Sequence, residues 1–388
     1  MYKNPFSKTV IGDDEPLCNQ KELLSALLLE AYSGNNNVLL APRRAGKTSL
    51  AMRLARDYRT AGGLATIADL DSVPSADAAA DRIATAIYAA LSVSDKVFKK
   101  LSGLVTAFTP VFTMNPDSSF SVSAMPSGKA KTGLERLVSV VDSLDRISSN
   151  SKTPLLVILD EFQDVALLNG SDQIEAALRS TIQHHKASYL FIGSRRKLLR
   201  DMFESPKRAF YRGATLREMP LISPSEFSAH LIALVKISGA VWSPAIADAI
   251  IDVAESHTYS VTAIAHALYE LTMLNSPTEF DLNKALTTAV ARESSLFTSI
   301  YSSLNPPARK LIEALAEEPT KHPTANSYIT NHRLSSHATV RKSLTALAEG
   351  DHIIKSSDET IVLTDPLFKR WLNTKWNSRQ LISNLSLT

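Results

Sequence analysis

The side chains with the clearest chemical capacity lie near residue 45, where an apolar run is followed by a loop ending in Gly-Lys-Thr. This order is typical of a phosphate-binding loop, in which backbone N–H groups at a helix start and one lysine bind nucleotide phosphates. The threonine hydroxyl is a suitable Mg²⁺ ligand. The pattern predicts phosphate contacts from a continuous set of residues: Pro42, Arg43, Arg44, Ala45, Gly46, Lys47, Thr48 and Ser49.

This phosphate loop, taken as residues 41–49, departs in one place from the usual G-x-x-x-x-G-K-[ST] pattern, because Ala41 replaces the first glycine. Alanine leaves room for the loop, although it disfavours a positive φ. A Gly-Lys-Thr that occurs in a loop by chance is the alternative. The strand pattern before the loop and the helical pattern from Ser49 to Tyr58 favour the phosphate-binding interpretation, because the mechanism needs both there.

A pair of acids, Asp160 and Glu161, follows an apolar run about 110 residues further along the chain. The run, PLLVIL, is typical of a strand buried on both faces of a sheet. Ligands bind at the carboxyl ends of parallel strands, which predicts that both acids lie beside the phosphate loop. We expect Asp160 to hold Mg²⁺, directly or through water, and Glu161 to polarise an attacking water. The alternative is a core strand that merely ends in two acids.

The elements that must position these residues alternate between strands and helices. Helical patterns between the strands predict a mostly parallel sheet with helices on both faces, and hence an α/β fold. An insertion at about 92–151 contains a predicted hairpin (Val111–Thr113 and Phe120–Ser123) and a helix (Gly133–Ile147). The five predicted strands of the sheet are Val38–Ala41, Leu64–Leu70, Leu155–Asp160, Tyr189–Gly193 and Thr215–Met219.

The second half of the chain has a different pattern, because residues 223–297 read as helices throughout. Ser223 has capping-box spacing with Glu226, and Ser243-Pro244 marks a second helix start. Residues 298–388 then predict a winged helix-turn-helix, with helices at Arg309–Ala316, Asn326–His332 and Ser335–Ala348 and a wing at Ile353–Lys355 and Thr360–Leu363. The chain is therefore predicted to hold a nucleotide-binding core (1–222), a helical lid (223–297) and a winged helix-turn-helix domain (298–388).

The composition is that of an ordinary globular chain, with 388 residues of which 44% are apolar and 21% charged. A net charge of +3 does not by itself indicate a nucleic-acid-binding protein. The single cysteine, Cys18, excludes an intrachain disulfide and fits a reducing compartment. The first residues lack the apolar segment of a signal peptide, and no run approaches 18 apolar residues, so we expect a cytoplasmic protein without a membrane span.

The motifs quoted so far resemble those of the archaeal-type ATPases, which are AAA-related P-loop proteins of the signal-transducing NTPase branch. The resemblance extends over nearly the whole chain and rests mainly on PRRAGKTSL at 42–50 and LDEFQ at 159–163. It implies a five-stranded ATPase core, a helical lid and a C-terminal winged helix, with ATP and Mg²⁺ as cofactors. Weaker matches lie at residues 4–6, 178–183, 193–194, 210–211, 257–259 and 365–371.

Two segments depart from the pattern of this family. Leu17-Cys-Asn-Gln20 stands where the family often has F-C-x-R, and His257-Thr-Tyr-Ser260 stands where the lid motif reads closer to H-P-Y-Y. Each departure removes an expected feature: an arginine contact from the lead-in, and a lid arginine that reaches the phosphates. Slow turnover of ATP is the expected consequence.

Several further residues have two interpretations each. Ser194 ends a predicted strand next to that of Asp160, so it either touches the γ-phosphate or attacking water, or caps the following helix. Arg212, with Arg208, either reaches the nucleotide of a neighbouring subunit, as in ring- or dimer-forming relatives, or belongs to a solvated basic surface. Arg43 and Arg44 either touch phosphates or brace the loop against acids or a partner subunit.

The sequence thus predicts a Mg²⁺-dependent ATPase that works as a switch or motor subunit, with Lys47 and Glu161 as central catalytic residues. A nucleotide-binding scaffold with little turnover is one alternative. Another is a DNA-binding loader of origin or transposition type, which would contact DNA through Arg341 and Lys342 on the recognition helix and Lys355 on the wing. A protein partner and a homo-oligomer stay open, and a role in defence against phage is taken only from what such ATPases often do.

Overall fold

The computed structural model describes residues 4–6, 17–18, 20–92, 108–114, 120–126, 132–151, 153–273, 275–356 and 358–374. The chain divides into two compact units. The core unit comprises Gly12–Ala41 and Lys47–Pro220, and the C-terminal unit comprises Met1–Ile11, Pro42–Gly46 and Leu221–Thr388. The phosphate loop therefore contributes residues to both units.

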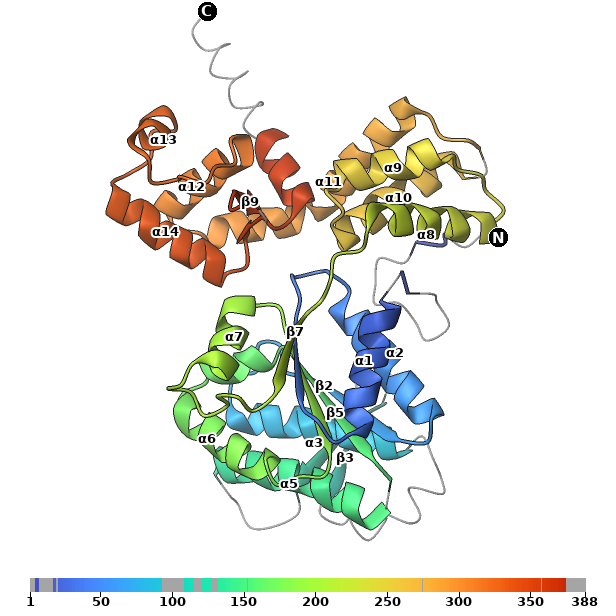
Figure 1. Cartoon of the computed structure of the whole chain (residues 1–388), viewed down its shortest axis with the longest axis vertical. Coiled ribbons are helices and arrows are strands. Elements are labelled where there is room, and N and C mark those ends of the chain that lie inside the picture. The colour runs from blue at the N-terminus through green and yellow to red at the C-terminus, as the bar shows by residue number, and fades with distance from the viewer. Residues whose placement is uncertain are drawn as a thin grey trace, which may run out of the picture. The chain divides into compact units, whose positions relative to one another are not determined.

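A five-stranded parallel sheet forms the centre of the core unit, with strand order β2-β5-β6-β1-β7 (Figure 1). The predicted α/β class and the predicted five-stranded sheet are confirmed, and each strand lies within one residue of its expected bounds. The strands are β1 (Asn37–Leu40), β2 (Leu64–Asp69), β5 (Leu155–Asp160), β6 (Ser188–Gly193) and β7 (Thr215–Glu218).

Side chains alternate between the two faces of this sheet, and each face is covered by its own helices (Figure 1). Leu39 and Ile158 pack with α1 (Lys21–Tyr32) and α2 (Lys47–Thr60). Their neighbours Val38 and Val157 pack on the opposite face. That face is covered by α3 (Ala76–Ser92), α5 (Gly133–Ser151), the 3₁₀ helix η1 (Phe162–Leu167), α6 (Ser171–Ile182) and α7 (Arg196–Glu204).

The predicted hairpin in the insertion is confirmed as the antiparallel pair β3 (Phe108–Met114) and β4 (Phe120–Pro126), in which Val111 pairs with Ser123. Both strands are longer than expected. The turn predicted between them, at residues 115–119, lies outside the described residues.

Helices make up the first part of the C-terminal unit: α8 (Pro224–Ile237), α9 (Pro244–Val253), α10 (Thr258–Thr272) and α11 (Glu279–Ser303). Ser223 and Ser243 cap α8 and α9 through their side chains, with proline following each cap as the sequence predicted. The long helix α11 continues without a break across the expected domain boundary at 297/298. Among the described residues, no helix is long and apolar enough to cross a membrane.

The winged helix-turn-helix arrangement is also present in the C-terminal unit. Three helices precede a two-stranded wing in which Ile354 pairs with Val362. The elements are α12 (Pro306–Glu317), α13 (Asn326–Asn331), α14 (His337–Glu349), β8 (Ile353–Lys355) and β9 (Ile361–Leu363). Ser336 caps α14 and Gly350 follows it, close to the predicted limits.

The first described residues belong to the C-terminal unit, although they begin the chain. Phe6 is buried and stacks on Trp242, with ring centroids 5.3 Å apart. The side-chain amide of Asn4 donates to the carbonyl oxygen of His266 at 3.1 Å. The Asn-Pro-Phe segment therefore anchors the start of the chain on α10 and the loop before α9.

Candidate nucleotide site

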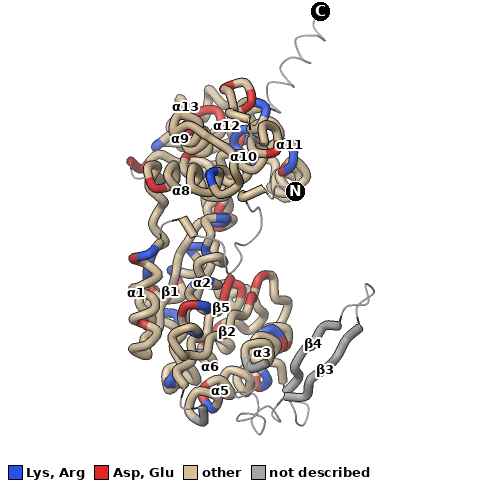
Figure 2. The backbone as a smooth tube through the Cα atoms, turned by 90° about the vertical axis from the view of Figure 1, so that its right-hand side faces the viewer, with Lys and Arg blue, Asp and Glu red and all other residues tan. Residues whose placement is uncertain are grey.

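Acidic residues gather at the carboxyl ends of β2 and β5 (Figure 2). Asp69 and Asp160 are the last residues of these neighbouring strands and lie in register. Glu161 follows Asp160, and Ser194 directly follows β6, the next strand in the sheet. The topology thus brings the predicted acids and Ser194 to one edge of the sheet, where parallel α/β folds bind ligands.

Lys47 is the first residue of α2 and pairs with Glu161. Its Nζ lies 2.6 Å from Oε1 of Glu161, and both side chains are largely buried. Burial alone would raise the pKa of Glu161, but the Lys47 ammonium and hydrogen bonds from Lys47, Gln163 and the Ser194 backbone lower it to about 2. Glu161 is therefore ionised near neutral pH, and the lysine and the acid form a buried ion pair.

The backbone of Glu161 adopts a left-handed conformation, with φ of 52°. This conformation is uncommon for a residue other than glycine and is costly unless the surroundings fix it. Here Glu161 stands before η1, and its carboxylate is held from several sides. With this turn, the Glu161 carboxylate reaches Lys47.

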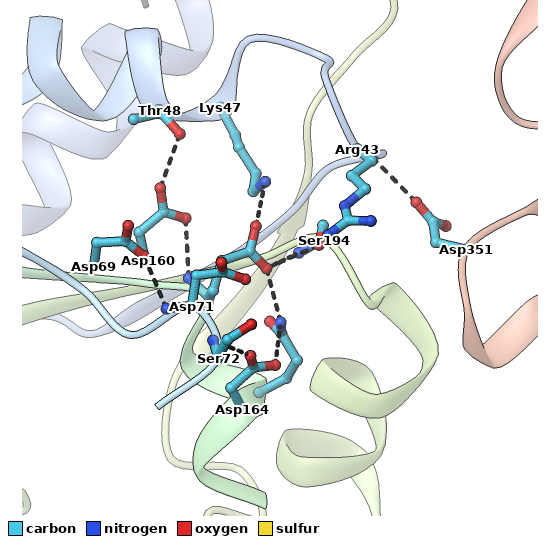
Figure 3. Close-up of polar contacts among 12 residues, drawn as sticks. Arg43, Lys47, Thr48, Asp69, Asp71, Ser72, Asp160, Asp164, Ser194 and Asp351 are labelled. Atoms are coloured by element: carbon cyan, nitrogen blue, oxygen red, sulfur yellow. Dashed lines mark hydrogen bonds and ion pairs between the residues drawn. The ribbon is translucent and has the colours of Figure 1, made fainter. Parts of the chain in front are cut away.

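Thr48 and Asp160 form a second pair beside the first. The Thr48 hydroxyl donates to Oδ2 of Asp160 at 2.9 Å, and the backbone N–H of Glu161 donates to Oδ1 at 3.0 Å (Figure 3). Burial raises the pKa of Asp160, while Lys47 and the bond from Thr48 act in the opposite direction. The hydroxyl and carboxylate oxygens are the hard ligands that Mg²⁺ prefers.

Thr48 and Asp160 are suitable as the ligands that a protein contributes to a Mg²⁺ site. In the described part of the chain, no group of three or more His, Cys, Asp or Glu side chains is arranged to hold a metal ion. Mg²⁺ commonly takes one or two protein ligands and completes its shell with substrate phosphates and water. Thr48 and Asp160 match that mode of binding.

Ser194 lies in the site, where it was predicted to touch the γ-phosphate or the attacking water. Both of its hydrogen-bond donors are bound to the carboxylate of Glu161. Its backbone N–H and its hydroxyl donate to Oε2 of Glu161 at 3.0 and 2.8 Å. Its predicted alternative role as a helix cap does not fit, because Arg195 is the N-cap of α7 and no side chain caps that end. Ser194 therefore holds the carboxylate of Glu161.

Gln163 and Asp164 also belong to this network, and the sequence reasoning assigned no role to either. The Gln163 side-chain amide donates to Glu161 at 2.7 Å and to Asp164 at 3.0 Å. Asp164 in turn accepts from the backbone N–H of Ser72 at 2.7 Å (Figure 3). The sequence does contain a signal, because two polar residues stand between the apolar Phe162 and Val165. All four side chains are buried in the structure, and buried polar groups need hydrogen-bond partners.

The phosphate loop itself has two positive φ values, 62° at Arg44 and 93° at Gly46. Ala41 has no such value, so alanine in place of the first glycine causes no strain of this kind. A turn closes between the N–H of Ala45 and the carbonyl of Pro42 at 3.3 Å. Ser49 lies buried in the first turn of α2.

Arg44 is braced by acids, which was one of its two predicted roles. Within the C-terminal unit its guanidinium lies 2.9 Å from Glu293 and 3.6 Å from Asp365. It also stacks over the ring of Tyr259, 4.1 Å from the centroid. Tyr259 donates its own hydroxyl to Glu293 at 2.5 Å. The side chain of Arg44 is therefore engaged by α10, α11 and Asp365.

Arg43 is bound through its backbone, with its N–H donating to Oδ2 of Asp351 at 3.1 Å (Figure 3). Its carbonyl oxygen lies 3.3 Å from Nε2 of His257. Burial lowers the pKa of His257, which favours the neutral ring. In that form Nδ1 accepts from the N–H of Ser260 and Nε2 donates to Arg43. The carboxylate of Asp351, in the winged helix, thus accepts a hydrogen bond from a backbone amide of the phosphate loop.

The two arginines before β7 differ in their surroundings. Arg208 bonds through two nitrogens to Glu175, whose side chain is 1% exposed. This buried ion pair, in place of a solvated surface, ties the segment before β7 to α6. Arg212 is exposed and stacks over the ring of Tyr211, 5.3 Å from the centroid. A catalytic role for Arg212 across subunits stays a prediction.

The predicted nucleic-acid contacts are exposed side chains of the winged helix. Arg341 and Lys342 lie on α14, and Lys355 ends β8. Their exposure leaves them available to a phosphate backbone.

Comparisons with known proteins agree with this geometry. Residues 295–374 match the family model described as a probable winged helix domain. A Walker-type ATPase of Pyrococcus abyssi superposes with a TM-score of 0.70 over 95% of this chain and 99% of that chain, at 14% identity. The chain has the fold of the Walker-type ATPases. A search of curated proteins gave no match.

Two proteins of Aeropyrum pernix, ORC2 and ORC1, are also similar in fold to this chain. ORC2, solved as ADPNP and ADP complexes, has a TM-score of 0.56 at 14% identity, with 98% of each chain covered. ORC1, solved in complex with DNA, has a TM-score of 0.50 at 12% identity, with 95% of each chain covered. The findings agree with the resemblance to archaeal-type ATPases that the motifs suggested.

Proposed function

We propose that this chain is a Mg²⁺-dependent ATPase that works as a switch or motor subunit in the cytoplasm. The observation that supports it best is the pairing of Lys47 with Glu161 and of Thr48 with Asp160 at one edge of the sheet. These pairs bring a cation, a hydroxyl and two carboxylates together at the edge of the sheet where parallel α/β folds bind ligands. ATP is favoured over GTP because the chain has no N-K-x-D guanine-reading motif.

In the proposed reaction, Lys47 exchanges its ion pair with Glu161 for the negative charge of the β- and γ-phosphates. Thr48 and Asp160 would hold Mg²⁺, and the ion would supply positive charge to offset the charge that develops on the phosphates. Oε1 of Glu161, once released by Lys47, accepts a hydrogen bond from the attacking water. Hydrolysis of ATP by purified protein with Mg²⁺, and its loss in variants of Lys47 and Glu161, tests this assignment.

The switch role is supported by the contacts of Arg43 and Arg44 in the C-terminal unit. Phosphate binding needs the backbone of the phosphate loop. In this loop the backbone N–H of Arg43 is bonded to Asp351, and the side chain of Arg44 forms ion pairs with Glu293 and Asp365. A change at the phosphates therefore acts directly on residues of the lid and winged helix. A ligand shifts an equilibrium between two conformations only if its contacts differ between them. The bonds made by Arg43 and Arg44 supply such a difference between the nucleotide-free and nucleotide-bound states.

Replacement of Arg44 by methionine is expected to separate nucleotide binding from the response of the C-terminal unit. Methionine keeps the apolar stem but removes the bonds to Glu293 and Asp365 and the charge over Tyr259. We expect wild-type protein to show an ATP-dependent change in the rate of limited proteolysis within residues 221–374, and the variant to lose most of it while still binding ATP. Peptide mapping of the digests measures this.

Arg146→Met is a suitable control for the Arg44 variant, because it removes an exposed arginine that pairs with Asp142 within the same helix. Its proteolysis pattern should follow the wild type. If the Arg44 variant keeps the full ATP-dependent change, the loop arginine does not transmit the nucleotide state.

A second candidate function, a DNA-binding loader, is favoured by the exposed positions of Arg341, Lys342 and Lys355. Recognition helices and wings contact DNA in winged helix-turn-helix proteins. The similarity in fold to ORC1, solved with DNA, agrees with this candidate.

The Arg341→Glu/Lys342→Glu double variant is expected to lower affinity for duplex DNA by at least tenfold at low salt, because two phosphate contacts become repulsive. Fluorescence anisotropy at several salt concentrations measures both the affinity and its salt dependence. Lys236→Glu/Lys284→Glu, at exposed positions on α8 and α11, is a control with the same change in charge. Equal DNA binding by wild type and the α14 variant would remove the DNA candidate and favour a protein partner.

A further inference from the structure

We propose that Gln163 is a positioning residue that anchors one carboxylate oxygen of Glu161, so that only the other oxygen changes partners during turnover. The proposal deepens the proposed ATPase function and rests on it. It assigns different roles to the two oxygens of one carboxylate.

The Gln163 side chain is buried, with 1% of its surface exposed. Its Nε2 donates to Oε2 of Glu161 at 2.7 Å and to Oδ1 of Asp164 at 3.0 Å. Both donors of the amide are therefore used by carboxylates. If the amide were rotated by half a turn, its oxygen Oε1 would face both carboxylates and be repelled by them. The charges of Glu161 and Asp164 therefore fix the orientation of the amide.

The two oxygens of Glu161 have unequal surroundings. Oε2 accepts three hydrogen bonds: one from Gln163 and two from the backbone N–H and hydroxyl of Ser194. Oε1 is bound by Lys47. Lys47 is the partner that the proposed reaction redirects to phosphate, so Oε1 is released toward water while Oε2 keeps its donors.

The surrounding backbone is shaped to hold this amide. A Cβ atom on Gly193 would lie 1.9 Å from Oε1 of Gln163, so any side chain at residue 193 would displace the amide. Asp164, the second acceptor, is held by the N–H of Ser72, whose φ is 54°. The network therefore joins Glu161 to residues that follow β2 and β6 as well as β5.

Gln163→Met tests the proposal, because methionine keeps the length of the side chain and removes both donors. We expect ATP affinity within about twofold of wild type, since the phosphate contacts are unchanged. The single-turnover rate of hydrolysis should fall on the order of tenfold, because Oε1 of Glu161 is no longer held where it accepts a hydrogen bond from water. Gln173→Met, on the exposed surface of α6, is the matched control.

Gly193→Ala provides an independent variant in case Gln163→Met does not fold. Its methyl group displaces the Gln163 amide without altering Gln163, and the same fall in hydrolysis at unchanged ATP affinity is expected. The proposal is overturned if the rate of hydrolysis matches wild type in a folded variant. It is also overturned if ATP affinity and hydrolysis fall by the same factor, since that is the effect of a structural role only.

A measurement without nucleotide separates this proposal from the proposed function. In Lys47→Met protein labelled with ¹³C-glutamate, the Glu161 carboxyl signal is identified by its absence after Glu161→Gln. At pH 7 this signal should broaden or split when Gln163→Met is added, because the carboxylate is no longer held in one orientation. Such a change with no ATP hydrolysis by wild type would sink the ATPase function but not the anchoring role, whereas an unchanged signal would sink the anchoring role.

Discussion

The Glu161→Gln variant should bind ATP as tightly as wild type and hydrolyse it at least about a hundredfold more slowly, the loss expected when a general base is removed. Glutamine has the same size as glutamate and can still accept the bonds from Ser194. It has no basic oxygen to polarise water. Binding and chemistry are therefore expected to separate in this variant.

Single-turnover hydrolysis with Mg²⁺, and ATP affinity from calorimetry, measure the two effects of Glu161→Gln. Glu22→Gln makes the same chemical change at an exposed position on α1 and should behave as wild type. Unchanged hydrolysis in the Glu161 variant would show that water is activated elsewhere. Tight ATP binding without turnover in wild type would instead favour the scaffold interpretation.

The second large effect is expected from Lys47→Met. The Lys47 side chain is 9% exposed and pairs with Glu161, which is 14% exposed. Loss of one partner of a buried ion pair leaves the other uncompensated and typically costs about 3 kcal/mol or more of folding stability. Asp160 also loses a nearby positive charge. We therefore expect both lower stability and a fall in ATP affinity of about a hundredfold, as suits the loss of a charge-assisted phosphate contact.

The stability effect of Lys47→Met has a definite pH dependence. The pKa of Glu161 in the folded protein is about 2, below its ordinary value of 4.5. A carboxyl group with a depressed pKa contributes stability above its unfolded pKa and loses that contribution as pH falls toward the folded pKa. The difference in unfolding free energy between wild type and the variant should thus be largest near pH 7 and shrink between about pH 4.5 and 2.

Urea unfolding of nucleotide-free protein at several pH values measures this difference. Lys21→Met removes an exposed lysine at the start of α1 and should change stability little at any pH. A difference that stays constant over the range would show that the Lys47–Glu161 pair contributes little to stability.

The sheet and the first residues of the site could be predicted from sequence because their signals are local. Buried parallel strands appear as short apolar runs, and β5 and β6 are buried at every position. The phosphate loop has its own spacing of glycine, lysine and threonine. Asp160 and Glu161 end an apolar run, so the topology alone brings them to the ligand-binding edge.

The partners of these residues could not be predicted, because they are distant in sequence and set by packing. Glu293 and Asp365, which hold Arg44, lie more than 240 residues beyond it. Nothing near Arg208 in the sequence marks Glu175 as its buried partner. Gln163 lies inside a recognised motif, yet its role depends on the close approach of Gly193 from another strand.

The unbroken course of α11 limits how the C-terminal unit can change in evolution. This helix of 25 residues joins α8–α10 to the winged helix without a hinge loop. Each residue inserted in it would rotate the winged helix about the helix axis by about 100°, and only additions near a whole turn would restore its facing. Homologues should therefore vary in the length of this connection by steps close to a helical period, and vary freely in the loops at either end.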